Sequence, residues 1–393
     1  MGGSKGLALG VVLALAGLAA GAWFVTREAR PPTEEARLTV AEALGGSEAG
    51  SEGFARATAP REFRFPEDHG PHPEFRTEWW YWTGNLAAAD GHTFGYQLTL
   101  FRNALAPHAA ERESAWGSRQ VYMGHFALSD IGGKRFYAFE RFNREALGLA
   151  GARAEPFRVW LEDWKVEGGE QGVFPMRLSA EDNGVALSLV LEQGKPPVLQ
   201  GDRGLSQKTA GAGNASYYYS LTRMPTRGTV TAGGRTWEVT GTSWMDREWG
   251  TKSLGAEQVG WDWFALQLSD GSELMHYQLR RQDGSADPFS AGVDISPQGE
   301  AVRLSRDEVR IEVLSTWRSP RSGTVYPARW RLSVPSRQLV LEITPAQEDQ
   351  ELPVTVLYWE GAVRIQGTRM GQPITGHGYV ELTGYGDTPE RTR

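Results

Sequence analysis

Short alternating segments separated by turn signals run from about residue 61 to the end of the chain, and they restrict the fold more than any other feature. Val, Leu, Thr and Trp recur at every second position, as in Phe157–Gly168, Val185–Gly194 and Gly228–Gly241. Asp-Gly, Gly-Gly, Asn-Gly or Pro turns follow after about 8 to 12 residues, which is typical of antiparallel sandwiches and barrels. A βαβ fold would need long amphipathic helices between the strands, and the sequence shows none. We therefore predict an all-β chain and exclude doubly wound nucleotide-binding folds.

A set of motifs occurs twice in the same order. An aromatic band precedes an Asp-Gly turn and a Tyr-Gln-Leu segment, and a glycine-led strand that ends in an acid follows much later. The copies are Trp80–Trp82 and Trp261–Trp263, Tyr96–Leu98 and Tyr277–Leu279, Leu187–Glu192 and Leu339–Glu342, and Gly241–Asp246 and Gly376–Glu381. Such self-similarity indicates duplication, although short β motifs also align by chance. We predict two β units, at residues 61–252 and 253–388, each a barrel whose inward side chains line a core or a pocket.

The N-terminus predicts export. Lys5 precedes an apolar segment from Leu7 to Val25, which contains the small-residue pattern Ala20-Gly21-Ala22 of a cleavage site. Its length is close to the roughly 20 residues that span a bilayer. Residues 1–30 are therefore a signal peptide or an uncleaved anchor, and residues 31–60 are predicted to be a tether with one short helix. We expect the body to be periplasmic, or anchored to the inner membrane and facing the periplasm, with the membrane as a partner through this segment.

Charge and composition exclude several classes of function. Lys and Arg total 41 against 48 Asp and Glu, so the net charge of −7 provides no basic field for nucleic acid. The chain has no Cys, which excludes disulfides and thiolate metal sites. His69 and His72 are separated by Gly-Pro, which prevents the helical zinc geometry, so we predict no metal and no cofactor. The Gly-x-Ser-x-Gly sequence of serine hydrolases occurs only at Gly2–Gly6, within the targeting segment.

The candidate catalytic residues lie in the stretch Trp244–Gly250. As a strand, it would place Trp244, Asp246 and Glu248 on one face and Met245, Arg247 and Trp249 on the other. A carboxyl group in apolar surroundings has a raised pKa and can act as a general acid, and an indole face can stabilise a carbocation. Asp246 and Glu248 are therefore the predicted catalytic residues. The alternative is that Asp246 forms a structural ion pair with Arg247 or Arg102.

The candidate ligand contacts come from the aromatic bands and from polar groups beside them. Fifteen Trp, 12 Tyr and 15 Phe suit a pocket for a large apolar molecule as well as an ordinary core. Glu78 either pairs with Arg76 or Arg102 or orients a ligand, and His125 is either a hydrogen-bonded core residue or an acid–base group. The predicted ligand contacts are Glu78, Trp79, Trp80, Tyr81, Arg102, His125, Trp244, Arg247, Trp249, Trp261 and Trp263.

The combination of these motifs resembles the AttH and carotenoid 1,2-hydratase family of tandem lipocalin-like proteins over about residues 60–388. The matching stretches are Asp68–Pro73, Glu78–Gly84, Phe94–Leu98, Phe101–Arg102 and Trp244–Gly250. The resemblance implies two lipocalin-like barrels that handle an isoprenoid or another lipid. The family also includes exported proteins labelled secreted hydrolases and fungal relatives that shape polyene cyclisations. Carotenoid hydratases are similar at Asp246 and Trp249 but carry histidine at the position of Arg247, and a guanidinium cannot exchange a proton near neutral pH.

Two classes of function follow from these expectations. The first is an exported protein of the cell envelope that binds an apolar lipid or isoprenoid, and the second is a hydro-lyase that adds water to an isoprenoid double bond. A scaffold that assists an envelope transport complex is a third possibility. A cavity that ends on Asp246 would favour catalysis, whereas a cavity lined only by rings and aliphatic groups would favour carriage.

Overall fold

The fold is all-β, as the alternating segments predict. The computed structural model describes residues 51–107, 117–170, 172–251, 254–255 and 257–386, and the helices of this part are short 3₁₀ turns at Glu67–His69, Ala146–Gly148, Arg306–Glu308 and Pro335–Arg337. None of these helices has the length and apolar character to cross a membrane. The predicted export segment and the short helix of the tether lie outside the described residues, so both stay predictions.

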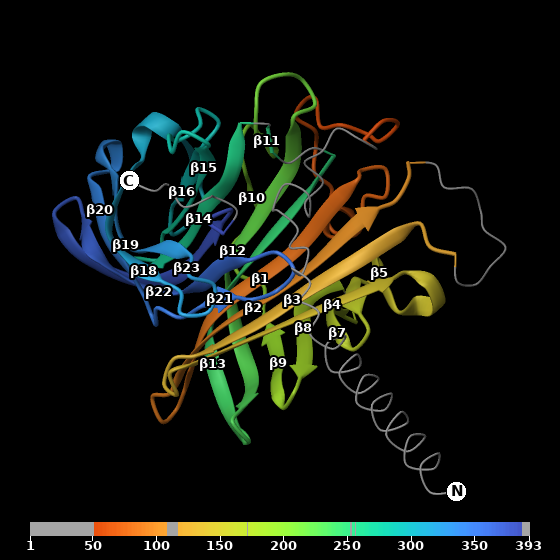
Figure 1. The fold of residues 1–393 in the computed structure, drawn as a ribbon, viewed down its shortest axis with the longest axis horizontal. Coiled ribbons are helices and arrows are strands. Elements are labelled where there is room, and N and C mark those ends of the chain that lie inside the picture. Colours follow the sequence, from red (N-terminus) through yellow and green to blue (C-terminus); the bar gives the residue numbers. More distant parts are fainter. Residues whose placement is uncertain (1–50, 108–116, 171, 252–253, 256, 387–393) are drawn as a thin grey trace, which may run out of the picture. The chain divides into compact units, whose positions relative to one another are not determined.

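The described strands form two antiparallel sheets (Figure 1). We call sheet A the 13-stranded sheet of β1 (Thr77–Ala88), β2 (Thr93–Ala104), β3 (Gln120–Asp130), β4 (Arg135–Arg144), β5 (Ala150–Arg153), β6 (Arg158–Leu161), β7 (Trp164–Gly169), β8 (Gly172–Asp182), β9 (Val185–Leu191), β10 (Val198–Leu199), β11 (Leu205–Gln207), β12 (Ala215–Ala232) and β13 (Arg235–Gly250). Sheet B is the 10-stranded sheet of β14 (Gln258–Leu268), β15 (Glu273–Arg281), β16 (Ala291–Ile295), β17 (Ala301–Ser305), β18 (Arg310–Arg318), β19 (Val325–Val334), β20 (Leu339–Pro345), β21 (Glu351–Leu352), β22 (Tyr358–Arg369) and β23 (Gln372–Thr383), drawn in teal to blue in Figure 1.

The same strand order occurs in both sheets. Sheet A contains the run β3-β2-β1-β13-β12-β9-β8, and sheet B contains the run β16-β15-β14-β23-β22-β20-β19. The duplicated motifs occupy equivalent strands, because the two glycine-led strands are β13 and β23 and the two Leu-rich segments begin on β9 and β20. Two separate observations, the order of the motifs in the sequence and the pairing of the strands, therefore support the duplication.

Three clusters of buried side chains divide the interior. One lies on the face of sheet A that carries Trp80 and Trp82, and another lies on the face of sheet B that carries Phe264 and Trp330. The third contains Tyr81, Trp263 and side chains of both sheets, so it lies between them. The two faces of a strand point in opposite directions, so each central strand contributes to two clusters. Both faces of the central strands are thus buried.

The folded part begins earlier than the predicted start near Arg61. Phe54 and Ala57 are buried, and the backbone N–H of Ala55 donates to the carbonyl of Glu74 at 2.9 Å. Residues 54–57, assigned to the tether from their composition, therefore pack against the folded body. Their apolar side chains are too few to have produced a periodic signal.

Gly95 on β2 marks a close approach of the two sheets. A Cβ added there would lie 2.6 Å from the Cβ of Ala362 on β22 and 2.6 Å from the hydroxyl oxygen of Tyr379 on β23. We expect Gly95→Val to force the sheets apart and to destabilise the fold by about 1–3 kcal/mol, with Gly95→Ala intermediate. Urea denaturation would measure both variants, and a valine variant as stable as the wild type would contradict this close contact.

Candidate active site

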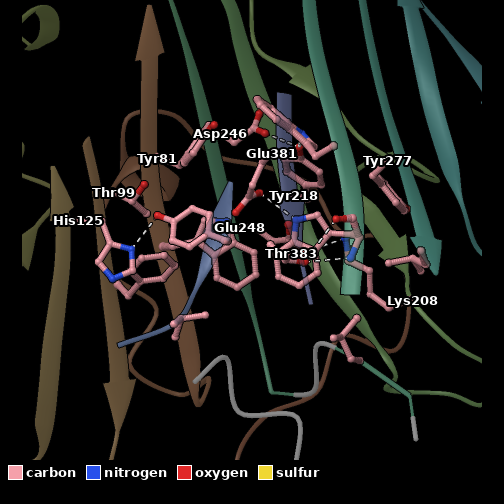
Figure 2. A pocket seen from close by; sticks show the side chains of 18 of the residues that line it. Tyr81, Thr99, His125, Lys208, Tyr218, Asp246, Glu248, Tyr277, Glu381 and Thr383 are labelled. Carbon is pink, nitrogen blue, oxygen red and sulfur yellow. Dashed lines mark hydrogen bonds and ion pairs between the residues drawn. The ribbon is translucent and has the colours of Figure 1, made fainter. Parts of the chain in front are cut away.

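A pocket opens between sheets A and B (Figure 2). The pocket holds about 950 Å³ of space that no protein atom fills, including the space at its open mouth. Aromatic rings from both sheets, among them Trp79, Phe101, Trp261 and Tyr277, form much of its wall. The inward side chains of each unit were predicted to line a core or a pocket, and they form buried cores. The pocket thus lies where the two sheets meet, with acids and rings contributed by each.

Asp246 lies on β13 at the wall of this pocket, as Figure 2 shows. The observed strand confirms the predicted alternation, because Asp246 and Glu248 reach the pocket while Arg247 points to the other face. The Asp246 carboxylate accepts hydrogen bonds from the hydroxyls of Ser220 and Tyr218 and from the indole N–H of Trp244, the last at 2.8 Å. Burial nevertheless raises the pKa of Asp246 to about 7, well above its usual value.

Glu381 on β23 is a second acid at the same pocket wall. Its carboxylate accepts a hydrogen bond from the indole N–H of Trp261 at 2.8 Å. Burial, with a further contribution from the charges of Asp246 and Glu248, raises the pKa of Glu381 to about 7. Sequence reasoning aligned Gly376–Glu381 with Gly241–Asp246 but did not transfer the candidate role, so this repeat was the signal that could have found Glu381.

Glu248 differs from the other two acids because it has a cationic partner. The Lys208 ammonium lies 3.0 Å from its carboxylate, and the Ser216 hydroxyl donates to the same oxygen. Burial works against the charge of Lys208, but the nearby Glu248 raises the pKa of Lys208 above its usual value. Lys208 also lies 4.4 Å from the ring centre of Tyr277. Glu248 is therefore held as part of an ion pair, which suits positioning better than proton transfer.

His125 lies at the side of the pocket away from Lys208 and Tyr277 (Figure 2). His125 contacts the Tyr358 hydroxyl at 2.8 Å and Glu140 at 3.0 Å, and not Asp130 a few residues along the chain. Beside Glu381, the buried Glu360 of β22 accepts a hydrogen bond from the Tyr81 hydroxyl, and burial together with the charge of Glu381 raises the pKa of Glu360 well above its usual value. At the His125 side, His125 and Tyr358 are the neighbouring polar groups. This end offers hydroxyl and imidazole groups to a polar substituent of a ligand.

Five of the predicted ligand contacts lie away from the pocket. They are Glu78, Trp80, Arg102, Arg247 and Trp249, and all are buried on the core side of sheet A. Trp244 does not line the pocket, but it donates a hydrogen bond to Asp246, which does. The predicted contacts that line the pocket directly are Trp79, Tyr81, His125, Trp261 and Trp263. Pocket residues that sequence reasoning missed include Thr99, Phe101, Lys208, Tyr218, Tyr277, Tyr358 and Glu381. Most of these belong to β strands or loops without a distinguishing motif.

The predicted structural alternative for Asp246 is wrong, because Arg102 and Arg247 both pair with Glu78. Asp246 and Arg247 are neighbours in sequence but face opposite sides of β13. Among the described residues, no group of three or more His, Asp or Glu side chains is arranged to hold a metal ion. His72 instead contacts Asp68 at 3.0 Å and stacks on Trp249, with ring centres 3.8 Å apart.

A family model described as AttH-like matches residues 56–385. The chain belongs to the AttH-like family. A crystal structure of an AttH-type protein from Nitrosomonas europaea is similar to it, with 36% sequence identity and a TM-score of 0.74 over 84% of this chain and 100% of that one. No curated protein sequence gives a significant match.

Two further solved structures share the fold of this AttH-like chain. Kievitone hydratase from Nectria haematococca has 14% identity and a TM-score of 0.65, covering 86% of this chain and 98% of its own. CghA has 14% identity and a TM-score of 0.50, covering 86% and 97%. At these identities the likeness extends to the fold alone.

The position of Arg247 changes the meaning of its difference from the carotenoid hydratases. Its guanidinium lies 4.0 Å from the ring centre of Trp80 and 5.0 Å from that of Trp249, and it donates to the carbonyl of Gly70 at 2.6 Å. These contacts are on the core side of sheet A, away from Asp246. In this chain the Arg247 side chain therefore faces away from the pocket, and the arginine is no argument against acid–base chemistry there.

Proposed function

We propose that this AttH-like chain binds an apolar, unsaturated molecule such as an isoprenoid between its two sheets and catalyses an acid–base reaction on it, of the hydro-lyase type. One observation carries the proposal: two buried carboxyl groups, Asp246 and Glu381, that titrate near neutral pH lie at the wall of an aromatic pocket. A pocket that only carried an apolar molecule would not need these two carboxyl groups, because burying each of them costs desolvation free energy.

Hydration needs a proton donor, a surface that tolerates positive charge and an acceptor for the proton of water. A carboxyl group would protonate one alkene carbon, forming a C–H bond and leaving a carbocation on the other. The rings of Trp261, Trp263 and Tyr277 line the pocket and could stabilise that cation through their negative faces. Water would then bond to the cation and lose a proton to a carboxylate. The similarity in fold to a protein named as a hydratase agrees with this reaction class but does not establish it.

The proposal predicts that water is added to a ligand. The body of the protein, purified without the N-terminal segment, would be incubated with an acyclic carotenoid in water labelled with heavy oxygen. The expected product gains one labelled water, measured by mass spectrometry, and ligand binding quenches tryptophan fluorescence. Quenching without product in a panel of isoprenoids would indicate carriage instead of catalysis, and neither quenching nor product would contradict the proposed ligand class. Export stays a prediction from the N-terminal segment, and assistance to an envelope transport complex stays a third possibility.

A further inference from the structure

We propose that Glu381 is the general acid of the pocket and that Asp246 acts opposite it as an ionised base. This assignment rests on the proposed acid–base function and divides the two proton transfers between the two halves of the chain. Both carboxyl groups line the pocket wall (Figure 2), and the charge of Asp246 acts on Glu381.

The pairing register places the two acids at equivalent positions. Asp246 on β13 pairs with Tyr81 on β1, and Glu381 on β23 pairs with Trp263 on β14. In each sheet, β13 or β23 lies beside the first strand of its unit, and both acids face the space between the sheets. The two acids therefore occupy equivalent positions of the two sheets.

The hydrogen bonds around Asp246 have a fixed direction. The Gln200 side-chain amide donates to the Ser220 hydroxyl at 2.9 Å, so that hydroxyl directs its own proton to Asp246. The Trp263 indole N–H donates to the Tyr218 hydroxyl at 3.2 Å, so the Tyr218 proton also points to Asp246. Together with the indole N–H of Trp244, three donors therefore converge on this carboxyl group. Hydrogen bonds of this kind favour its ionised form.

Glu381 has fewer donors. Among the described residues, its only hydrogen bond is the one from Trp261, to Oε2, which leaves Oε1 available to carry a proton toward a ligand. The neighbouring titratable groups are Asp246 and Glu248 of β13, whose charges act on Glu381, and Glu360 of β22, whose pKa lies well above its usual value; Lys208 balances the charge of Glu248. Ionising both Asp246 and Glu381 would place two negative charges without a cationic partner in a pocket lined by aromatic rings. Near neutral pH the pair therefore holds one proton, and the donors around Asp246 place that proton on Glu381.

The proton balance of a turnover follows from this assignment. The O–H bond of Glu381 breaks as its proton forms a C–H bond with the alkene, and Glu381 becomes a carboxylate. Water adds to the carbocation, and its released proton goes to Asp246. Exchange with solvent then returns a proton to Glu381 and removes one from Asp246, which restores the starting state.

The test compares Glu381→Gln, Glu381→Asp and the exposed Glu312→Gln control with the wild type. With an acyclic carotenoid as the probe, we expect Glu381→Gln to lower kcat by about 10²- to 10⁴-fold and Glu381→Asp to retain part of the activity. Infrared spectroscopy without ligand should show that Glu381→Gln lacks a protonated carboxyl band that the wild type loses as pH rises through neutrality. In Asp246→Asn this band should titrate at lower pH, because a neighbouring negative charge is gone.

Loss of both the band and the turnover in Glu381→Gln, with Glu312→Gln unaffected, would support the assignment. An active wild type whose Glu381→Gln variant keeps its kcat and pH profile, or keeps the titrating band, would overturn it. A wild-type protein that converts no isoprenoid probe would instead overturn the proposed function itself, so the two failures are distinguishable.

Discussion

Replacing Asp246 with asparagine is expected to lower kcat by about 10²- to 10⁴-fold while the fold stays intact. The amide has nearly the shape of the carboxyl group, and its oxygen can still accept from Ser220 and Trp244. It cannot gain or lose a proton near neutral pH, so the step that uses Asp246 stops. Ligand binding, followed by quenching of tryptophan fluorescence, should change little, and the loss should therefore appear in kcat and not in the dissociation constant. Unchanged turnover would remove Asp246 from the reaction.

The pH dependence of stability provides a control for this variant. The pKa of Asp246 is about 7 in the folded protein and 3.8 as an isolated side chain. The unfolded state therefore releases this proton at lower pH, so the contribution of Asp246 to the stability of the wild type falls as pH rises from about 4 through 7. Asparagine has no such penalty. The melting temperature of Asp246→Asn relative to the wild type should rise with pH over this range, and a constant difference would show that Asp246 does not titrate as proposed.

Local sequence patterns correctly predicted which side chains share a face within a single strand. The alternation in Trp244–Gly250 correctly separated Asp246 from Arg247, because side chains on a strand point to opposite faces whatever surrounds it. The paired motifs likewise fall on equivalent strands, β13 and β23. Such inferences need only the period of the strand and the order of the motifs.

Sequence patterns could not predict which buried face belongs to a core and which to a pocket. The aromatic bands align as Trp80 with Trp261, yet Trp80 packs in the core of sheet A and Trp261 lines the pocket. In the structure the equivalence is shifted by one residue from this alignment. Tyr81 pairs with Asp246 and Trp263 pairs with Glu381, so Tyr81 and Trp263 hold equivalent positions. Both faces of these strands are apolar, so hydrophobic alternation gives no signal to choose between them. Pairing across the sheet settles the register, and that pairing joins residues far apart in sequence.

The site also depends on loops and side chains without a motif. Lys208, in the segment before β12, forms an ion pair with Glu248, which lies 40 residues later in the sequence. Glu360 comes from the second half of the chain and accepts a hydrogen bond from the Tyr81 hydroxyl. Burial and these long-range contacts determine the pKa values of the acids. Neither can be derived from local composition, whereas the repeat could have placed Glu381 beside Asp246.

The largest expected loss of stability comes from a substitution of Glu78, which lies in a buried cluster of charged side chains at the start of β1. The Glu78 carboxylate accepts from the guanidinium groups of Arg102 and Arg247 and from the backbone N–H of His72. Arg102 also donates to the carbonyls of His72 at 2.9 Å and Phe75 at 2.8 Å. Burial alone would raise the pKa of Glu78, but Arg247 and Arg102 hold it well below its usual range. One carboxylate therefore compensates two buried cations and fixes the loop before β1.

Glu78→Gln is expected to destabilise the protein by about 3–5 kcal/mol, because it leaves two guanidinium groups buried without a counter-charge. A matched control exists on the surface, where Glu342 contacts Arg329 at 2.6 Å and Arg331 at 3.1 Å with its side chain 37% exposed. Glu342→Gln should cost no more than about 1 kcal/mol, since water solvates its arginines. Urea denaturation at neutral pH would measure both. The Glu78 contribution is present above the ordinary pKa of 4.5 and decreases as pH falls below it, so the gap between wild type and Glu78→Gln should narrow in acid. Equal losses in the two variants, or a gap that does not depend on pH, would show that the buried charge of Glu78 does not hold this part of the fold together.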